Sequence, residues 1–572
     1  MGEVAALQRK TRRTWRLFPL ILLVSLAAPA LRAQTAPADP GLDIQRRQEQ
    51  ELEAQRARAA ERPDVFSAPA QAPAEGVLTL PQESPCFVIT DIRWEGQAPP
   101  AWATSEADAV LSRCVGALGL QALQQHLMAM MIARGKVTAR VLVPEQSLAQ
   151  GVLTLRYVRG RIAAVRADGA PGWWRMALPA WEDGDVDQRD LDQALENVRR
   201  LGGQSDAAID LVPGAQPGDT DIVLKPGTGK RLHGYAGLDN GGMSSTGDWQ
   251  MNAGLTVDSP LFLYDQLSAS WNSNADRGNS AAGSRAASLH YSIPFGYWTA
   301  FAGASRSRYR QTVPGFDAPI VYGGTSKQVE AGLSVVPYRG TDHKGNLSAK
   351  LYRKRATSTL DDIEIEVQRR DVVGLELGYS HRQYLGQAVL DAGVSWRASI
   401  PRWSDAPGFV LGEENWNGRS RVLLGSAGVF LPFALAGQRW GYQANWQIQH
   451  ADTAILPADY FTIGNRYAVR GFDGEMTLAG ERGWTLRNDL SMNLGDTGHQ
   501  LYGGVDAGRV GGQAAAYLPS RTLIGAVLGL RGRAAVGPVN ANYDLSLGWP
   551  LKKPDLLETA STTVAFSLTF DF

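Results

Sequence analysis

The chain has 572 residues, and 57 Lys and Arg residues balance 57 Asp and Glu residues, so the formal net charge is zero. This balance argues against nucleic-acid binding, and the length exceeds one ordinary globular core, so several folding units are expected. Glycine (62) and tryptophan (16) are abundant although only 44% of the residues are apolar. This composition suits a wall whose two faces meet different solvents.

The N-terminus has the pattern of a secretory signal peptide. A basic stretch precedes the apolar run Leu17–Leu26, and small residues follow it. The run is too short to span a bilayer, and no other window offers roughly 18 uninterrupted apolar residues. We therefore expect residues 1–33 to be a signal peptide, cleaved after Ala30 or Ala33, and the mature chain to have no transmembrane helix.

Residues 34–62 have the composition of a polar helix. Charged residues lie on nearly every side of it, and Arg47 stands one helical turn from both Asp43 and Glu51. Because such a helix has no apolar face, it is either a solvated tail or a polar rod in a polar cavity. Residues 63–85, rich in Pro and Ala, are expected to form a linker.

Two small α/β units are predicted next, at 86–160 and 161–229. A strand from Phe87 to Trp94 opens the first, and leucines at three-to-four-residue steps mark a helix over 120–131. The second repeats the pattern, with its helix over 187–201, and two further strands close each unit. The free sheet edges are templates for an extended segment of another chain; rigid spacers without a client are the alternative.

The chain has two cysteines, Cys86 and Cys114. In an exported chain, oxidising conditions favour a disulfide between them, which closes a loop of about 28 residues and contributes roughly 3 kcal/mol in the chain-entropy model. Two free buried thiols are the alternative. A metal site is not expected, because no cluster of His and Cys accompanies the pair.

From residue 230 to Phe572 the helical period gives way to a two-residue alternation. Apolar residues from Val539 to Trp549, for example, alternate with Asn, Asp, Ser and Gly, so one face suits an apolar medium and the other suits water. Strands of about ten residues in an even number predict a closed antiparallel barrel in a membrane, since every backbone group must be paired inside the wall. Sixteen strands are predicted, starting near residues 231, 248, 264, 283, 297, 324, 344, 373, 386, 418, 438, 484, 499, 524, 536 and 560.

The longest predicted connection between strands, about 451–482, contains the sequence Val469-Arg470-Gly471-Phe472. Asp506 lies on the second strand beyond this connection, within the segment Tyr502 to Gly508. An arginine in a long turn and an aspartate on a nearby barrel strand indicate a charged pair inside the barrel.

These features together resemble the outer-membrane transporters of two-partner secretion, which serve haemolysins, filamentous haemagglutinins and contact-dependent inhibition toxins. The α/β units resemble POTRA domains. The sequence Val469-Arg470-Gly471-Phe472 is similar to the family's VRG(Y/F) motif at the tip of the sixth extracellular loop, and Tyr502–Gly508 is similar to its aspartate motif on the thirteenth strand. Cys86 and Cys114 are similar to paired cysteines of haemolysin and toxin transporters. The resemblance also implies that the N-terminal helix occupies the pore at rest.

Physical chemistry also explains why Arg470, Gly471 and Phe472 suit a loop inside the barrel. A loop folded into the lumen carries its arginine into a confined space, where an unpaired charge costs several kcal/mol. The planar fork of Arg470 suits bidentate pairing with Asp506, Gly471 permits close backbone approach, and Phe472 can pack against the wall. Such a contact is expected to hold the loop in one conformation during transport. Two separate solvated charges are the alternative.

No catalytic site is predicted. Residues 226–230 lack the GxxxxGK[ST] spacing of a phosphate-binding loop, and residues 185–190 lack the central glycine of a calcium loop and suit a helix N-terminus. We expect no enzymatic activity, no metal and no cofactor.

The predicted function is secretion of one large exoprotein through an outer-membrane barrel in a Gram-negative bacterium, with the α/β units in the periplasm. The exoprotein is an adhesin, a haemolysin or a contact-dependent toxin with an N-terminal secretion domain. Other expected partners are outer-membrane lipids and the barrel assembly machinery, for which Phe570 and Phe572 form a C-terminal assembly signal; nucleic acid is not expected. The alternatives are an outer-membrane protein assembly factor, which shares the barrel and the VRG-type loop, and a diffusion porin, which shares the barrel alone.

Overall fold

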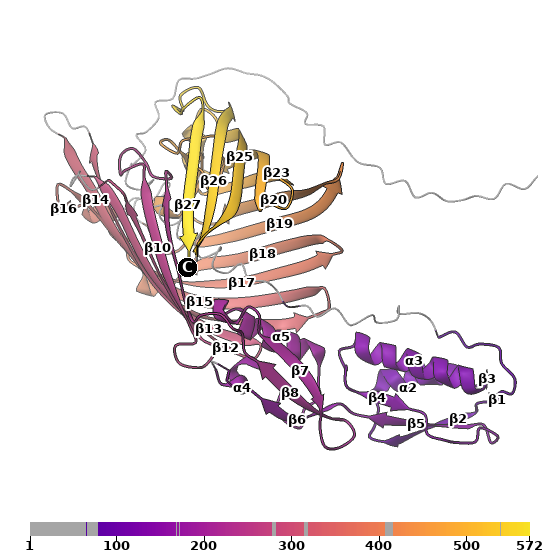
Figure 1. Ribbon diagram of the computed structural model, residues 1–572. Helices are drawn as coiled ribbons and strands as arrows, with labels where there is room; N and C mark the ends of the chain where they lie inside the picture. The colour runs from indigo at the N-terminus through magenta and orange to yellow at the C-terminus, as the bar shows by residue number, and fades with distance from the viewer. Residues whose placement is uncertain are drawn as a thin grey trace, which may run out of the picture. The chain divides into compact units, whose positions relative to one another are not determined.

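The computed structural model of the chain describes an antiparallel barrel and two α/β units (Figure 1). The described residues are Val65, 78–167, 169–170, 172–276, 282–313, 319–406, 416–537 and 539–572. The predicted signal peptide 1–33, the predicted helix 34–62 and most of the predicted linker lie outside the described residues. Among the helices that are described, none is both long and apolar enough to cross a membrane.

The first α/β unit consists of a sheet in the order β2-β5-β4 and two helices. Its elements are β1 (Phe87–Val88), β2 (Asp91–Gly96), α2 (Ala101–Ala107), β3 (Cys114–Val115), α3 (Ala117–Ala133), β4 (Arg140–Leu142) and β5 (Val152–Val158). The predicted leucine stripe of α3 is its buried face, because Leu123 and Leu127 are fully buried in one cluster with Leu153 and Leu155. Hydrophobic burial of this face is the main favourable contribution to the unit's folding.

The prediction that one continuous strand opens this unit is wrong in one respect. The segment is divided into β1 and β2, because β1 pairs with β3 whereas β2 pairs in parallel with β5. The predicted disulfide is present, with the Cα atoms of Cys86 and Cys114 5.3 Å apart. It joins the segment before β1 to β3.

The second α/β unit has a sheet in the order β6-β8-β7. Its elements are β6 (Arg161–Arg166), α4 (Trp174–Ala177), α5 (Gln188–Arg199), β7 (Ala208–Pro213) and β8 (Asp219–Lys225). Residues 185–190 form a helix N-terminus, since Asp187 caps α5 by accepting a hydrogen bond from the Arg189 N–H at 2.9 Å. The four-residue helix α4 is too short to give a periodic signal in the sequence.

In the described residues, sixteen long antiparallel strands close into the barrel, and β16 (Ile363–Glu364) is a two-residue addition to β15. The first eight strands are β9 (Leu232–Asp239), β10 (Gln250–Asp258), β11 (Gln266–Asn274), β12 (Gly283–Phe295), β13 (Trp298–Val313), β14 (Ile320–Arg339), β15 (His343–Leu360) and β17 (Arg370–Leu385). The other eight are β18 (Ala388–Ser399), β19 (Arg421–Leu435), β20 (Gln438–Ala451), β23 (Arg482–Asn493), β24 (His499–Gly511), β25 (Thr522–Val536), β26 (Val539–Lys552) and β27 (Thr563–Asp571). The predicted sixteen-stranded antiparallel barrel is thus confirmed.

The barrel closes where β27 pairs with β9. The C-terminal residue Phe572 extends this pairing, because its N–H and C=O each form a 2.9 Å hydrogen bond with Gly234. A Cβ atom at position 234 would lie 2.5 Å from the Phe572 ring. The missing side chain of Gly234 therefore leaves the space in which this ring lies. The chain end is therefore built into the closing seam.

Candidate functional site: a loop held inside the barrel

The connection between β20 and β23 folds against the inner face of the barrel. It contains β21 (Phe461–Ile463) and β22 (Leu478–Gly480), which pair with each other. Val505, Leu528 and Leu547 are exposed on the outer face of β24, β25 and β26. Residues next to them in the strands therefore face inward, because side chains alternate along a strand. The loop packs on these inward positions.

Apolar packing holds the predicted motif in this position. Val469 is completely buried and Phe472 is 3% exposed, and both belong to one cluster with residues of the wall. The other buried members of this cluster are Ile463, Ala468, Leu478, Val510, Ala515, Leu523 and Leu557. The motif is therefore part of a hydrophobic core between the loop and the wall.

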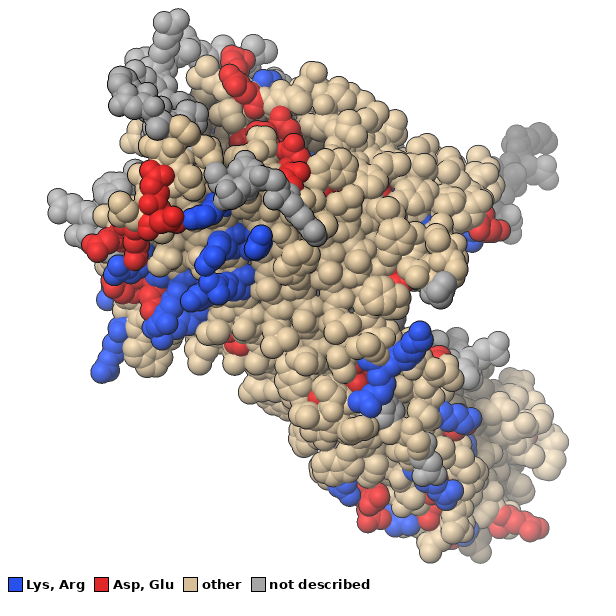
Figure 2. All heavy atoms as spheres, turned by 60° about the vertical axis from the view of Figure 1, so that its left-hand side comes forward, with Lys and Arg blue, Asp and Glu red and all other residues tan. Residues whose placement is uncertain are grey.

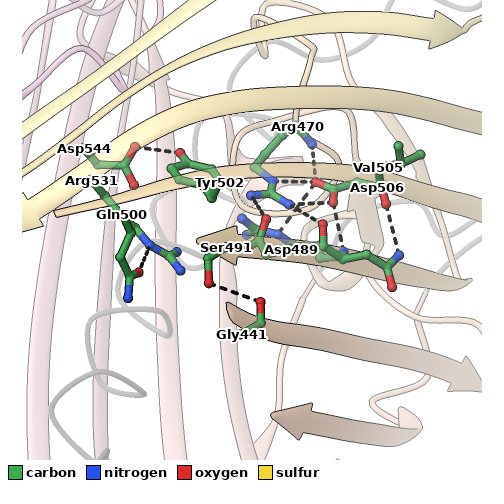
Figure 3. A network of polar contacts seen from close by, with 12 residues as sticks. Gly441, Arg470, Asp489, Ser491, Gln500, Tyr502, Val505, Asp506, Arg531 and Asp544 are labelled. Carbon is green, nitrogen blue, oxygen red and sulfur yellow. Dashed lines mark hydrogen bonds and ion pairs between the residues drawn. The ribbon is translucent and has the colours of Figure 1, made fainter. Parts of the chain in front are cut away.

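Within this core, Arg470 contacts two carboxylates of the wall (Figure 3). Its Nε and Nη2 donate to the two oxygens of Asp506 at 2.7 and 2.8 Å, a bidentate geometry, and its backbone N–H donates to Asp506 Oδ2 at 3.0 Å. Its Nη1 lies 2.7 Å from Asp489 Oδ1 of β23 as an ion pair outside hydrogen-bonding geometry. We name Arg470, Asp489 and Asp506 the loop latch.

The loop latch also completes the backbone hydrogen bonding of the wall. The ladder between β23 and β24 is continuous except between Leu486 and Asp489, where two pairs are missing. At this gap the Asn488 N–H donates to Asp506 Oδ1 at 3.3 Å, and the Asn488 C=O accepts from Arg470 Nη2 at 3.3 Å. A membrane-spanning wall cannot leave such groups unpaired without a cost of several kcal/mol. The loop is therefore a structural part of the barrel.

The electrostatic environment keeps Arg470 charged. The side chain of Asp506 is fully buried and that of Arg470 is 12% exposed. Burial alone would lower the pKa of the Arg470 guanidinium, but the hydrogen bonds and charge of Asp506, together with the charge of Asp489, raise this pKa above its ordinary value. Removing one partner from such a buried pair typically costs about 3–5 kcal/mol, because the other charge is left uncompensated.

Glycines of the wall allow the loop backbone to come close. A Cβ atom at Gly525 of β25 would lie 1.9 Å from the Arg470 carbonyl oxygen, and one at Gly548 of β26 would lie 2.8 Å from Gly471 Cα. Gly471 has a φ of +98°, a conformation that residues with a Cβ rarely adopt, and its own Cβ would meet the Trp549 carbonyl oxygen at 2.5 Å. Glycine on both sides of the contact is therefore a steric requirement.

The remaining predicted site residues divide into two groups. Gly508 belongs to the loop contact, since a Cβ there would lie 2.8 Å from Val469 Cγ2. Tyr502 lies on the same strand and donates its hydroxyl to Asp544 Oδ1 at 2.7 Å, which continues the polar network along the wall (Figure 3). Phe570 and Phe572 lie at the closing seam, and the disulfide lies in the first α/β unit, so neither belongs to the loop latch.

Two charged residues of this site were missed in the sequence. Asp489 completes the loop latch, and Arg487 Nε lies 3.8 Å from Asp506 Oδ2 while its Nη1 donates to the Tyr467 carbonyl oxygen at 3.2 Å. Arg487 and Asp489 are two positions apart on β23. Because side chains alternate along a strand, this spacing could have predicted that both residues face inward. Across the described ranges, no group of three or more His, Cys, Asp or Glu side chains is placed to hold a metal ion.

Comparisons with known proteins show the family of this chain. The family model described as haemolysin secretion/activation protein ShlB/FhaC/HecB matches residues 218–532, and the ShlB-type POTRA domain matches residues 87–160. The outer membrane transporter CdiB-2 of Burkholderia pseudomallei is 32% identical over 97% of this chain and 99% of that protein. The hemolysin transporter protein ShlB of Serratia marcescens is 30% identical over 75% of this chain and 77% of that protein.

Solved structures show the same fold. CdiB from Acinetobacter baumannii matches with a TM-score of 0.79 and 27% identity, covering 94% of this chain and 100% of that chain. CdiB from Escherichia coli matches with a TM-score of 0.81 and 25% identity over the same shares. The chain belongs to the ShlB/FhaC/HecB family of haemolysin secretion and activation proteins, the outer-membrane transporters of two-partner secretion.

Proposed function

We propose that this transporter secretes one large exoprotein through its barrel and that the loop latch keeps the β20–β23 connection in a transport-competent position. The observation that carries the proposal is the bidentate contact of Arg470 with Asp506, which joins the loop to the barrel wall and fills the gap in the β23–β24 ladder. A loop fixed in this way leaves a defined path beside it. A loose loop would sample positions that obstruct the path.

The client is proposed to bind first to the α/β units in the periplasm. Residues 161–229 are proposed to be a second POTRA domain after the one at 86–160. The sheet orders leave β2 and β4 of the first unit, and β6 and β7 of the second, at the edges. An unfolded client segment can add to such an edge through main-chain hydrogen bonds.

The chemistry of the client follows from the relatives. Their names include outer membrane transporters CdiB and a hemolysin transporter, so the client is proposed to be a haemolysin, a contact-dependent toxin or an adhesin with an N-terminal secretion domain. The transporter is proposed to perform no enzymatic step, and client folding outside the cell drives export. Residues 34–62 are proposed to occupy the pore at rest and to leave it during transport.

Assembly of the transporter involves two further partners. The barrel assembly machinery is proposed to recognise Phe570, which lies on the strand that closes the ring, and Phe572, which directly follows this strand. Outer-membrane lipids are proposed to surround the apolar outer face, on which Trp271, Leu289 and Leu351 are exposed. Both proposals concern insertion of the barrel and are independent of client choice.

Replacement of Arg470 by alanine tests the proposed role of the loop latch. We expect Arg470→Ala to abolish secretion of the client encoded beside the transporter gene, while the barrel still reaches the outer membrane and migrates in its heat-modifiable form. Arg439→Ala is a matched control, because Arg439 is 64% exposed and its ion-pair partner Asp496 is 92% exposed. Normal secretion by Arg470→Ala would contradict the proposed role.

A further inference from the structure

A group of basic side chains lies on the outer face of four adjacent strands, β12 to β15. Side chains alternate along each strand, and these positions share the face of the exposed residues Leu289, Val329 and Leu351. The group consists of Arg285, Arg306, Arg308, Arg310, Lys327, Arg353 and Arg355, which we name the cationic patch. Figure 2 shows Lys and Arg gathered on one part of the barrel surface, beside a broad area without charge.

The strand register brings these residues together. Arg285 is paired with Arg308 across β12 and β13, and Arg306 is paired with Lys327 across β13 and β14. Lys327 is in turn paired with Arg355 of β15. Like charges directly opposite each other in a sheet are destabilising, so this arrangement opposes barrel stability in the absence of an anion.

The carboxylates nearby do not neutralise the cationic patch. Arg353 and Arg355 share Asp371, with hydrogen bonds of 2.6 to 2.8 Å, and Arg310 pairs with Asp362. No carboxylate of the described residues lies within ion-pairing distance of the other members. These unpaired members are Arg285, Arg306, Arg308 and Lys327.

The cationic patch lies toward the extracellular side of the barrel. The short turn between β12 and β13 is on the opposite side, because its residue Gly296 donates to Met176 and accepts from Asn197, both of the second α/β unit. Strand β13 rises from that turn, so Arg306, Arg308 and Arg310 are in its far half. Below them on the same face are the apolar positions that contact lipid, such as Leu289 of β12 and Val329 of β14.

The surface is hollowed at the patch. A depression of about 960 Å³ is lined by Trp271, Arg285, Arg308, Arg310, Thr325 and Thr357, and the carboxylates Asp276 and Asp362 also line it. Guanidinium groups bind phosphate oxygens bidentately, and threonine hydroxyls add neutral hydrogen bonds. The depression thus offers donors for an anionic head group directly above a lipid-facing wall.

We propose that the cationic patch binds the phosphates of the phosphorylated glycolipid that forms the outer leaflet of the outer membrane. Charge complementarity supports an anion, and continuity with the apolar band supports an anion that carries acyl chains. Clusters of basic residues at a membrane surface recognise anionic head groups in this way. The bound phosphates would relieve the repulsion between Arg306, Lys327 and Arg355 on neighbouring strands. This site concerns the membrane around the barrel and does not depend on which client is secreted.

The proposal can be tested with the purified full-length transporter in detergent. Bisphosphorylated lipid A is titrated onto the unmodified protein, onto Arg306→Gln/Arg308→Gln and onto the control Arg439→Gln/Arg533→Gln, and bound lipid is counted by native mass spectrometry. The control changes the same charge at two exposed arginines near the periplasmic turns. Each basic residue near an anionic surface contributes about 1 kcal/mol, so the patch variant is expected to bind on the order of thirtyfold more weakly.

Three results would overturn the proposal. The first is equal lipid A affinity for the patch variant and the control, with both barrels shown to be folded by heat-modifiable migration. The second is equally tight binding of phosphatidylglycerol, which would indicate a general response to anionic lipid. The third is complete displacement of lipid A by millimolar inorganic phosphate, which would indicate a simple anion site. Weaker binding of monophosphorylated lipid A to the unmodified protein would support it.

Discussion

The loop latch and the cationic patch use the same residue type in opposite surroundings. Arg470 is 12% exposed and contacts two carboxylates, whereas Arg306 and Arg308 are exposed, and among the described residues no carboxylate pairs with them. A charge removed from water must be compensated within the protein, whereas a charge at the surface is solvated and free to meet an external anion. The inner arginine therefore fixes the structure of the protein, and the outer arginines offer a binding surface.

The largest expected effect comes from removing the shared acceptor of the loop latch. In Asp506→Ala, Arg470 and Arg487 lose their common carboxylate and the Asn488 N–H loses its acceptor. Loss of one partner of a buried pair costs about 3–5 kcal/mol, so we expect secretion to fall to background and the barrel to unfold at a lower temperature. Heat-modifiable migration over a temperature series measures the second effect.

A matched control for this variant is Asp496→Ala. Asp496 also pairs with an arginine, Arg439, but its side chain is 92% exposed. Exposed ion pairs contribute about 0–1 kcal/mol, so this variant is expected to secrete and to unfold like the unmodified protein. Equal secretion and equal unfolding temperatures of Asp506→Ala and Asp496→Ala would contradict the proposed difference between the inner and the outer charges.

A smaller effect is expected from crowding the contact while leaving every charge in place. In Gly525→Ala the new Cβ would lie 1.9 Å from the Arg470 carbonyl oxygen, so the loop must shift. Overpacking of this kind costs about 1–3 kcal/mol, and we expect secretion to fall by roughly tenfold. Secretion is measured as client in the culture medium relative to transporter in the outer membrane.

Gly503→Ala separates this steric effect from a general effect of alanine in the wall. The nearest heavy atom to a Cβ at Gly503 is the Val527 carbonyl oxygen at 3.6 Å, an ordinary contact. This variant should secrete normally. If both glycine variants secrete equally well, close approach of the loop backbone is not needed for transport.

The smallest effect on secretion is expected from the cationic patch. In Arg306→Gln/Arg308→Gln two exposed side chains on the outer face are replaced, and substitutions of this kind usually change stability by no more than about 0.5 kcal/mol. We expect client secretion within about twofold of normal, even though lipid A binding is weakened. A loss of secretion as severe as that of Asp506→Ala would show that the two regions share one task.

The strands and the motif were predictable because their signals are local. Alternation of apolar and polar residues has a period of two in a strand, so the starts of the sixteen strands were predicted within four residues of the observed positions. The leucine stripe of α3 was equally clear, and the sequence Val469-Arg470-Gly471-Phe472 stood out in the longest connection. Each of these features depends on neighbours within a few residues along the chain.

Tertiary structure decided which of these residues meet. The place of Asp489 beside Arg470, the need for glycine at Gly525 and the grouping of Arg306 with Lys327 all depend on strand register and on how the loop folds back. A shift of one residue in register turns every side chain of a strand to the other face. The sequence by itself therefore determined the barrel and the presence of an arginine in its longest loop, whereas closure of the ring determined which charges are buried in pairs and which face the membrane.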